Sequence, residues 1–551
     1  MDTPLISKNR KYITVLLVVA LVLPSLAVLP NSSAASSPSG TATPIKHVVI
    51  IILENHAFDS VFGTYPFGYP PVVNNVTLSV MRPVNYIYNL SYVQLLEESH
   101  GNVTWVNVTY KGKVYHPYYA NSTVLVNPHE GYINYHTDWD WGRMDGFING
   151  SGVQSLAYIS YEQVPLLWDY AEEYVLFDDF FSPTLSVTVP NRLAYITGYP
   201  TVVENDSPVF GFLPLNTTIV YQLSQYNVSW GWYEYGYSRD FQFLSPTLYL
   251  GHNNTAPLPL SEFKGSSVFD SHYHDLTDFI QEALNGSLPA VSFVMFTGPY
   301  GYDEHVPGYD MHPPFNTTLA MIALAKVINS VMEGKDWNST AIFITFDEGG
   351  GYYDPVPPPI VYGYGIANAP TMSKYMKGYF TLGQRIPLLV ISPYAKEGFV
   401  DNYTASGYSI LAFIDYNWHL PYLNPIVEEF GPQAILYAFN FSQSPRPPIV
   451  LTPQNWTYPL PLQYPVHYGY VATIHNNYTA YQVLYRELEM GNYSLPTAFV
   501  DANVPGNVVA TGAGAATSGG SSPGTAAYLV VGVVVVAVVI ALGVVYSRRR
   551  K

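Results

Sequence analysis

The sequence predicts an α/β fold built on a largely parallel central sheet. Two observations predict it: short apolar runs with the composition of buried strands, and helical patterns that alternate with them between residue 45 and about residue 420. The runs are rich in β-branched and aromatic residues, which is typical of strands covered on both faces. They occupy residues 48–53, 290–295, 341–346 and 387–391. Residues 318–333 and 408–418 carry apolar side chains at helical spacings.

The first and third of these strands end in pairs of ligand-type residues. Glu54 and Asn55 follow the first, and Asp347 and Glu348 follow the third. Ligands of parallel sheets bind just beyond the carboxyl ends of the strands. We therefore expect both pairs to converge on one site, where oxygen atoms would suit a hard divalent cation or zinc. The alternatives are a strand-end cap for the first pair and a solvated turn for the second.

Composition excludes several classes of function. The chain has 551 residues and 48% apolar content, enough to bury a large core in one or two domains. It has no cysteine, which excludes disulfides, thiolate metal sites and cysteine nucleophiles. The net charge is −17, and no basic stripe occurs outside the termini, so we expect no nucleic-acid partner.

The N-terminal segment has the layout of a secretory signal peptide, which we assign to residues 1–35. Lys8, Arg10 and Lys11 precede an apolar run, and small residues follow it. The alternative is a retained N-terminal anchor. Nineteen Asn-x-Ser/Thr acceptor sites are spread along the chain, as expected for an exported glycoprotein.

The C-terminal segment predicts a membrane anchor. Residues 527–546 form an uncharged, Val-rich run long enough to cross ~30 Å of hydrocarbon. Residues 547–551 are basic, and the positive-inside rule keeps such a tail in the cytoplasm. Residues 511–526 are rich in Gly, Ala and Ser, which predicts a flexible stalk. We expect a single-pass protein at the cell surface, with its bulk outside and its C-terminus in the cytoplasm.

The rest of the chain is divided by composition. We expect a main domain over residues 45–430 and an extension, residues 431–510, packed on it. Residues 60–128 and 200–270 lack the strand–helix rhythm and are rich in Tyr, Asn and Pro, which predicts insertions or small antiparallel extensions. Only 11% of residues are charged while 50 are Tyr, and we interpret this as a surface built for acid.

Five blocks of sequence carry a family signature. They are KHVVIIILENHAFDSVFG (46–63), PH with GRMDGF (128–129 and 142–147), TVPNR (188–192), DEGGGYYD with VPPP (347–354 and 356–359), and RIP with ISPY (385–387 and 391–394). In this order they resemble the phosphoesterases that comprise bacterial phospholipases C and acid phosphatases. In the first block His56 stands where the family usually has Arg.

The resemblance implies an alkaline-phosphatase-like α/β sandwich that hydrolyses phosphate esters. Carried over block by block, Glu54, Asn55, Asp347 and Glu348 would hold or flank one divalent metal ion, whose identity is left open. Thr188 would be the nucleophile and a further metal ligand. A threonine hydroxyl needs a base or a cation to activate it, and such a metal would supply that activation.

Local sequence supports this role for Thr188. Pro190 favours the first turn of a helix that would run to Thr197, and a helix start near Thr188 presents N–H groups to phosphate. The alternative is an ordinary threonine in a Ser/Thr-rich loop.

The histidines match the family less well. His129 would contact the phosphate or the leaving group, with His136 a weaker candidate. His312 resembles a family histidine, although Met311 separates it from Asp310, and His305 is a rival placement.

Other family histidines are absent. Pro355 replaces one, and two more are missing near Asn402 and Gly407, which leaves the leaving-group acid open. Because imidazolium stays charged in acid and cannot serve as a base, their loss fits the hypothesis of acid adaptation.

Three functions remain open at this point. The first is a phosphoesterase acting on monoesters, as an acid phosphatase, or on phospholipid diesters, as a phospholipase C. The second is a non-catalytic, adhesin-like surface glycoprotein that keeps the fold. The third is a sulfatase or phosphomutase, but this chain lacks the array of metal-binding histidines expected of those enzymes. The oligomeric state is not indicated.

Overall fold

The computed structural model describes most of the predicted main domain. It covers residues 40–65, 108–198, 217–234, 272–296, 309–362 and 379–452, with short strands at 72–73, 76–77, 213–214, 250–252, 256–257 and 467–468. Within these residues no helix is long and apolar enough to cross a membrane. The predicted signal segment 1–35, stalk 511–526, membrane span 527–546 and basic tail 547–551 lie outside the described residues.

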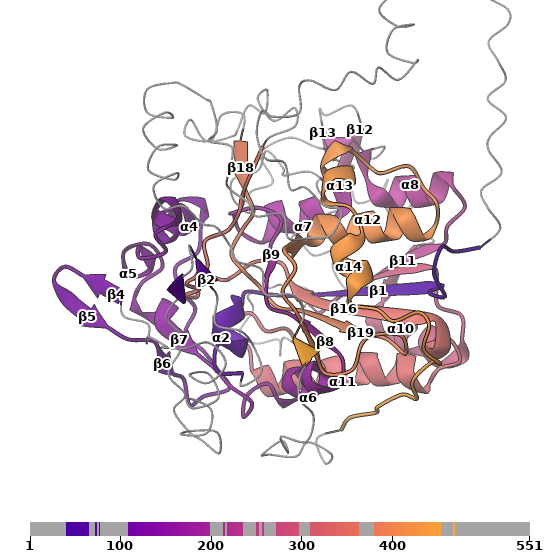
Figure 1. Cartoon of the computed structure of the whole chain (residues 1–551), viewed down its shortest axis with the longest axis horizontal. Helices are drawn as coiled ribbons and strands as arrows, with labels where there is room; N and C mark the ends of the chain where they lie inside the picture. The colour runs from indigo at the N-terminus through magenta and orange to yellow at the C-terminus, as the bar shows by residue number, and fades with distance from the viewer. Residues whose placement is uncertain are drawn as a thin grey trace, which may run out of the picture.

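A nine-stranded sheet forms the centre of the molecule (Figure 1). Its strands lie in the order β14 (Tyr273–Asp275), β11 (Trp230–Glu234), β15 (Val291–Met295), β1 (His47–Leu53), β16 (Thr340–Phe346), β19 (Leu388–Ile391), β8 (Val175–Phe177), β20 (Phe399–Asp401) and β22 (His467–Tyr468).

The sheet is mostly parallel, which confirms the predicted class. Neighbouring strands from β14 through β16 pair in parallel, and so do β8, β20 and β22. Strand β19 pairs antiparallel with both β16 and β8, so it alone runs in the opposite direction. An apolar run carries no information about strand direction, and this reversal was not predicted.

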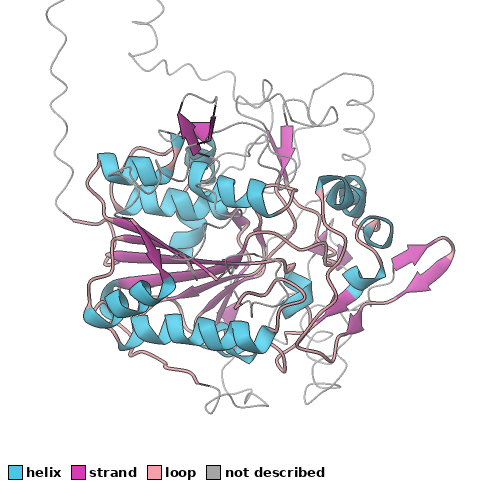
Figure 2. Cartoon of the chain, turned by 180° about the vertical axis from the view of Figure 1, so that it is seen from behind, coloured by secondary structure: helices cyan, strands magenta, loops and turns pink. Residues whose placement is uncertain are grey.

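Helices cover both faces of the sheet (Figure 2). The first face carries α6 (Pro165–Glu173), α10 (Leu276–Asn285) and α11 (Thr317–Glu333), and the second carries α7 (Thr188–Thr197), α8 (Ile219–Gln225) and α12 (Gly407–Asn417). Helices α11 and α12 confirm the two helices predicted at 318–333 and 408–418. Their apolar sides are buried against the sheet, as their spacing requires.

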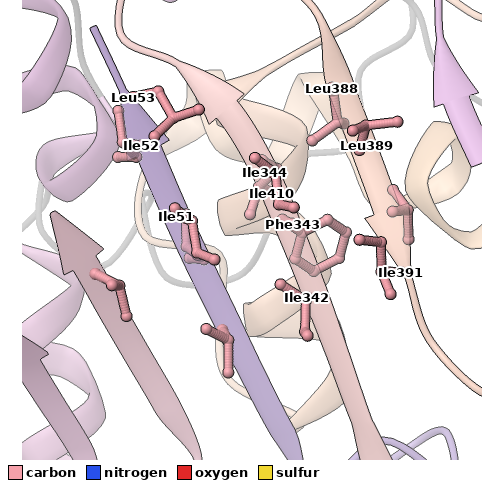
Figure 3. Packing of buried hydrophobic residues seen from close by; sticks show 14 of the residues in the cluster. Ile51, Ile52, Leu53, Ile342, Phe343, Ile344, Leu388, Leu389, Ile391 and Ile410 are labelled. Atoms are coloured by element: carbon pink, nitrogen blue, oxygen red, sulfur yellow. The ribbon is translucent and has the colours of Figure 1, made fainter. Parts of the chain in front are cut away.

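The core lies along the two strands that lead to the acidic pairs. Every residue of β16 is buried, and so are all of β1 except His47. Figure 3 shows Ile51 of β1, Ile344 of β16 and Leu389 of β19, which are paired in register across neighbouring strands and so form one layer on the same face of the sheet. Burying each such side chain contributes roughly 1.5–3 kcal/mol, so this layer fixes the strands that position the site.

The predicted insertions and extension are described only in part. Strands β4 (Val108–Tyr110) and β5 (Lys113–Tyr115) form an antiparallel hairpin in the first insertion. In the extension, Arg446 Nη1 donates to the carbonyl of Glu173 on α6 at 2.7 Å, and Tyr170 donates to the carbonyl of Ile449 at 3.3 Å. The described part of the extension therefore packs on the main domain.

Candidate active site

Strand register brings the two acidic pairs to the same edge of the sheet. Leu53 of β1 is paired with Phe346 of β16, so the residues that follow them are neighbours. The backbone N–H of Asn55 donates to Asp347 Oδ1 at 3.3 Å, which ties the two strand ends together. Glu54, Asn55, Asp347 and Glu348 are all at most 1% exposed. The structure thus places all four predicted ligand residues in one buried group.

The glycines after Glu348 allow the chain to approach Asn55. Asn55 itself has a left-handed backbone, with φ of 58°, and Gly350 has φ of 64°. A Cβ on Gly350 would lie 2.6 Å from the carbonyl oxygen of Asn55, so a side chain there would displace the backbone. The N–H of Gly350 also donates to Glu348 Oε2 at 2.6 Å.

Tyr135 holds the other oxygen of Glu348. It lies in α4 (Tyr132–Trp139), and its hydroxyl donates to Glu348 Oε1 at 2.9 Å. Burial raises the pKa of Glu348 well above its usual range, and the charges of Asp347 and Glu130 raise it further. Sequence reasoning missed Tyr135, which occurs in an unremarkable run of the chain.

Thr188 lies at the start of α7, where a helix was predicted to begin. Its hydroxyl donates to Glu54 Oε2 at 3.2 Å, and the residue is fully buried. The predicted nucleophile is therefore in direct contact with one of the predicted metal ligands.

Arg192 joins the two acidic pairs, and sequence reasoning assigned it no role. It lies in α7, its Nε donates to Asp347 Oδ2 at 3.2 Å, and its Nη2 donates to Glu54 Oε1. Burial by itself would lower the pKa of Arg192, but the charges of Glu54, Asp347 and Asp310 outweigh burial and raise it. The guanidinium is therefore a permanent buried cation. Arg192 is the last residue of the TVPNR block, and this block was the feature of the sequence that could have revealed it.

Asp310 is a second residue that sequence reasoning did not place in the site. Its Oδ1 accepts from the backbone N–H of Glu54 at 2.8 Å. Its Oδ2 is buried without a hydrogen-bond partner, and so is Asn55 Oδ1. Burial raises the pKa of Asp310 to about 6, although the charge of Arg192 acts in the opposite direction.

His312 reaches this group through Glu130. The ring is 2% exposed, and its Nε2 lies 3.5 Å from Glu130 Oε1. The same carboxylate oxygen accepts from Asn55 Nδ2 at 2.7 Å. Burial raises the pKa of Glu130, while the nearby His312 charge lowers it. Glu130 was missed, although it directly follows a residue of a family block.

The other histidines are placed differently. The side chain of His129 is exposed, and its backbone N–H donates to the carbonyl of Ser151 at 2.9 Å. His136 packs in α4 with its Nδ1 2.8 Å from the carbonyl of Tyr132, and burial lowers its pKa to about 4. His305 lies outside the described residues. Of the histidine candidates in the described ranges, only His312 joins the acidic group.

His56 is a neutral side chain where the family usually has a cation. Its ring is stacked on Tyr352 with centroids 4.8 Å apart, and its Nδ1 lies 3.1 Å from Ser60 Oγ. Burial lowers its pKa to about 3. A buried imidazole with a lowered pKa therefore directly follows Glu54 and Asn55 in the chain.

The side chains of the site fit a hard divalent cation in chemical type. All the atoms that could bind the metal are oxygens. Two of them, Asn55 Oδ1 and Asp310 Oδ2, are buried and have no hydrogen-bond partner. No three His, Asp or Glu side chains of the described segments are grouped as a ready metal site. The guanidinium of Arg192 instead bridges Glu54 and Asp347.

Solved structures with detectable similarity have low scores. A protein in the alkaline phosphatase superfamily from Vibrio parahaemolyticus is 14% identical, with 56% of this chain and 70% of that chain covered and a TM-score of 0.29. Murine ectonucleotide pyrophosphatase/phosphodiesterase 5 is 12% identical, with coverage of 47% and 91% and a TM-score of 0.28. TM-scores this low do not establish a common fold.

Relatives by sequence are named phospholipases C. A non-hemolytic phospholipase C of Burkholderia pseudomallei is 27% identical over 69% of this chain and 56% of its own length. Phospholipase C B of Mycobacterium tuberculosis is 24% identical over 76% of this chain and 82% of its own. Non-specific phospholipase C6 of Arabidopsis thaliana is 26% identical over 65% and 63%. The chain spans little more than half of the Burkholderia relative.

One family model matches most of the chain. It is described as the Phosphoesterase family and matches residues 45–421, which contain all five sequence blocks and the whole acidic group. The chain belongs to the Phosphoesterase family.

Proposed function

We propose that the chain is a phosphoesterase in which Thr188 is the nucleophile. The contact between the Thr188 hydroxyl and Glu54 Oε2 at the start of α7 carries this proposal. A threonine attacks only when its hydroxyl is oriented and activated, and here it meets a buried carboxylate beside a fixed cation, Arg192. The phospholipase C names of the relatives support the reaction class.

The reaction is a double displacement at phosphorus. Thr188 Oγ1 forms a bond to phosphorus while the bond from phosphorus to the leaving oxygen breaks, and the threonine proton ends on that oxygen. A water oxygen then attacks the phosphorus of the phosphothreonine. As the new bond from phosphorus to hydroxide forms, the bond from phosphorus to Thr188 Oγ1 breaks, and the other proton of the water restores the Thr188 hydroxyl. Because Thr188 is fully buried, substrate enters only after the atoms that cover it move.

A divalent metal completes this proposal. Glu54, Asn55, Asp347, Glu348 and Thr188 would hold it. Once bound, it would polarise a phosphoryl oxygen and offset the negative charge of the site. The protein's own contribution is positioning: Tyr135 and the Gly350 N–H fix Glu348.

The proposed substrate class follows the names of the relatives. A phospholipid diester is the first candidate, because the relatives are named phospholipases C. A phosphate monoester is the second, since in-line attack by a threonine on phosphorus serves both. His312 and His129 remain proposed contacts of the phosphate or leaving group.

We also propose that the enzyme acts outside the cell and is held at the cell surface by a membrane anchor. The support is the signal-like segment at residues 1–35 and the apolar run at 527–546 with its basic tail. Protease treatment of intact cells tests this, because a surface domain is released and an internal one is not.

Hydrolysis assays test the proposed activity. We would measure turnover of p-nitrophenyl phosphate and p-nitrophenyl phosphorylcholine by residues 36–510, with Thr188→Ala and a chelator as controls. Loss of turnover in both controls supports the mechanism, and the preferred substrate assigns the class. A folded wild-type protein that is silent on both substrates and binds no metal would favour the adhesin-like surface glycoprotein.

A further inference from the structure

We propose that Arg192 is a positioning residue that orients the Thr188 nucleophile through Glu54. This inference rests on the proposed function, because it requires Thr188 to attack phosphorus. Thr188 and Arg192 are four residues apart in α7 and so lie on the same side of the helix. Both reach the same carboxylate: Thr188 donates to Glu54 Oε2, and Arg192 donates to Glu54 Oε1.

The carboxylate of Glu54 is thereby held at both ends. A carboxylate bonded through one oxygen rotates about its terminal bond, whereas one bonded through both oxygens presents fixed lone pairs. The Thr188 hydroxyl then has one defined direction. The arrangement fixes the position of Oγ1 before substrate arrives, and a displacement of about 1 Å at a reacting atom costs on the order of 10²-fold in rate.

Arg192 is itself held by contacts to three elements. Its Nε donates to Asp347 Oδ2, its Nη2 to Glu54 Oε1, and its Nη1 approaches the sulfur of Met295 at the end of β15. These three contacts come from the ends of β1, β15 and β16, which are neighbouring parallel strands. The side chain of Arg192 therefore fixes the position of α7, which carries the nucleophile, relative to the edge of the sheet.

The geometry favours a guanidinium over an ammonium. A planar guanidinium donates in several fixed directions and can satisfy two carboxylates at once, while a lysine presents one point charge on a flexible stem. Arg192 is 1% exposed, so water cannot replace a missing hydrogen bond. Arg192→Lys keeps the charge and removes the two-carboxylate clamp.

The chain offers a matched control in Arg385. That arginine is equally buried, and it pairs with the carboxylates of Asp59 and Asp354 at 2.6 and 3.1 Å. No contact joins it to Thr188 or Glu54 among the interactions seen in the described residues. Arg385→Lys therefore makes the same change in a similar setting without touching the nucleophile.

The experiment compares kcat, KM and metal affinity in both lysine variants. We expect Arg192→Lys to lower kcat about 100-fold with KM within about threefold of wild type, because orientation is lost and substrate binding is not. Divalent-metal affinity, measured by calorimetry with Mg²⁺, Mn²⁺ and Zn²⁺ in turn, should fall or stay constant. Arg385→Lys should leave kcat within about threefold.

Chemical rescue separates positioning from simple structural support. Millimolar guanidinium should raise the kcat of Arg192→Ala at least tenfold. The free cation can occupy the vacated space and donate to both carboxylates. Methylammonium of equal charge should restore much less. If Arg192→Lys does not fold, the alanine variant with guanidinium still decides the matter.

Two results would overturn the inference. Wild-type kcat in Arg192→Lys would show that no clamp is needed. Tighter metal binding in Arg192→Ala, with kcat unchanged, would show that Arg192 competes with the metal. Failure of the proposed function is recognised separately, because Thr188→Ala would then retain turnover whatever the arginine variants do.

Discussion

Two buried arginines each bridge two carboxylates near the carboxyl end of β1, and they differ in what they leave unsatisfied. Arg385 donates to Asp354 and Asp59 and to the carbonyl of Asp178. Its ring neighbour is Phe58, with the guanidinium carbon 4.4 Å from the ring centroid. In the described segments, neither of its two carboxylates has a buried oxygen that lacks a hydrogen bond.

The group around Arg192 also consists of one arginine and two carboxylates, but it lies beside buried acceptors that have no hydrogen-bond partner. Glu54 and Asp347 are bridged, but the adjoining Asn55 Oδ1 and Asp310 Oδ2 remain buried and unpartnered. A buried acceptor without a donor costs free energy, so each one calls for an explanation such as a water, an ion or a ligand. In the described segments, the Arg385 group has no such acceptor among its carboxylates, whereas the Arg192 group adjoins two.

The largest expected difference is in activity. Glu54→Gln removes the carboxylate that holds both Thr188 and Arg192, and we expect kcat/KM to fall by about 10³-fold, the scale of a lost preorganised electrostatic contact. Asp59→Asn makes the matched change beside Arg385. Burial raises the pKa of Asp59 to about 7, although Arg385 acts against it, so an amide resembles its form in acid. Steady-state kinetics should show that Asp59→Asn keeps kcat/KM within about threefold of wild type. Equal losses in both variants would contradict the difference between the Arg192 and Arg385 groups.

The next effect is on stability. Arg385→Met leaves two buried carboxylates without their cation, which typically costs about 3–5 kcal/mol. Urea unfolding should register this loss, while kcat per folded molecule stays close to wild type. A stable Arg385→Met protein with little activity would move Arg385 into the catalytic group.

A third prediction concerns pH. Burial raises the pKa of Asp415 to about 8, and its partners are neutral donors, Gln222 Nε2 at 3.2 Å and Leu423 N at 2.9 Å. A raised folded pKa means that stability is fully present below the unfolded pKa near 4 and is lost as pH rises towards 8. A pKa raised from about 4 to about 8, at roughly 1.4 kcal/mol for each pKa unit, makes the loss from this one group on the order of 5 kcal/mol.

Asp415→Asn tests this directly. The free energy of unfolding of the variant, relative to wild type, should increase steadily from pH 4 to pH 8. His56 and His136 act in the opposite sense, because their pKa values are lowered, but they are common to both proteins and cancel. Parallel pH profiles for the two proteins would rule out a titrating Asp415.

The smallest expected effect is at Tyr135. Tyr135→Phe removes the hydroxyl that donates to Glu348 Oε1, and an unsatisfied buried acceptor costs about 1–3 kcal/mol. We expect a modest fall in melting temperature and a metal affinity lowered several-fold. Tyr158→Phe serves as the control, since that buried tyrosine lies in the same packing cluster as Tyr135.

The sequence predicted the strands and the meeting of the acidic pairs for a physical reason. Parallel strands end at one edge, so Glu54 and Asp347 had to be neighbours once β1 and β16 were paired. The start of α7 at Thr188 was likewise encoded locally, by Pro190. These features depend on short-range patterns and on one general rule of sheets.

The missed residues depend on tertiary placement. Arg192 acquires its role only when α7 lies against the ends of β1 and β16, and Tyr135 only when α4 reaches Glu348. Glu130 was passed over because His129 next to it resembles a family histidine, yet His129 is exposed and Glu130 accepts from Asn55 Nδ2. No local pattern distinguishes these outcomes.

The identity of the phosphorylated residue during turnover tests the proposed mechanism most directly. We would mix wild-type enzyme with substrate, quench rapidly in acid, digest the protein and map the added phosphoryl group by mass spectrometry. We expect phosphothreonine at Thr188 in wild type and none in Thr188→Ala. Product formed with no phosphoenzyme on the millisecond timescale, or a phosphoryl group on another residue, would contradict it.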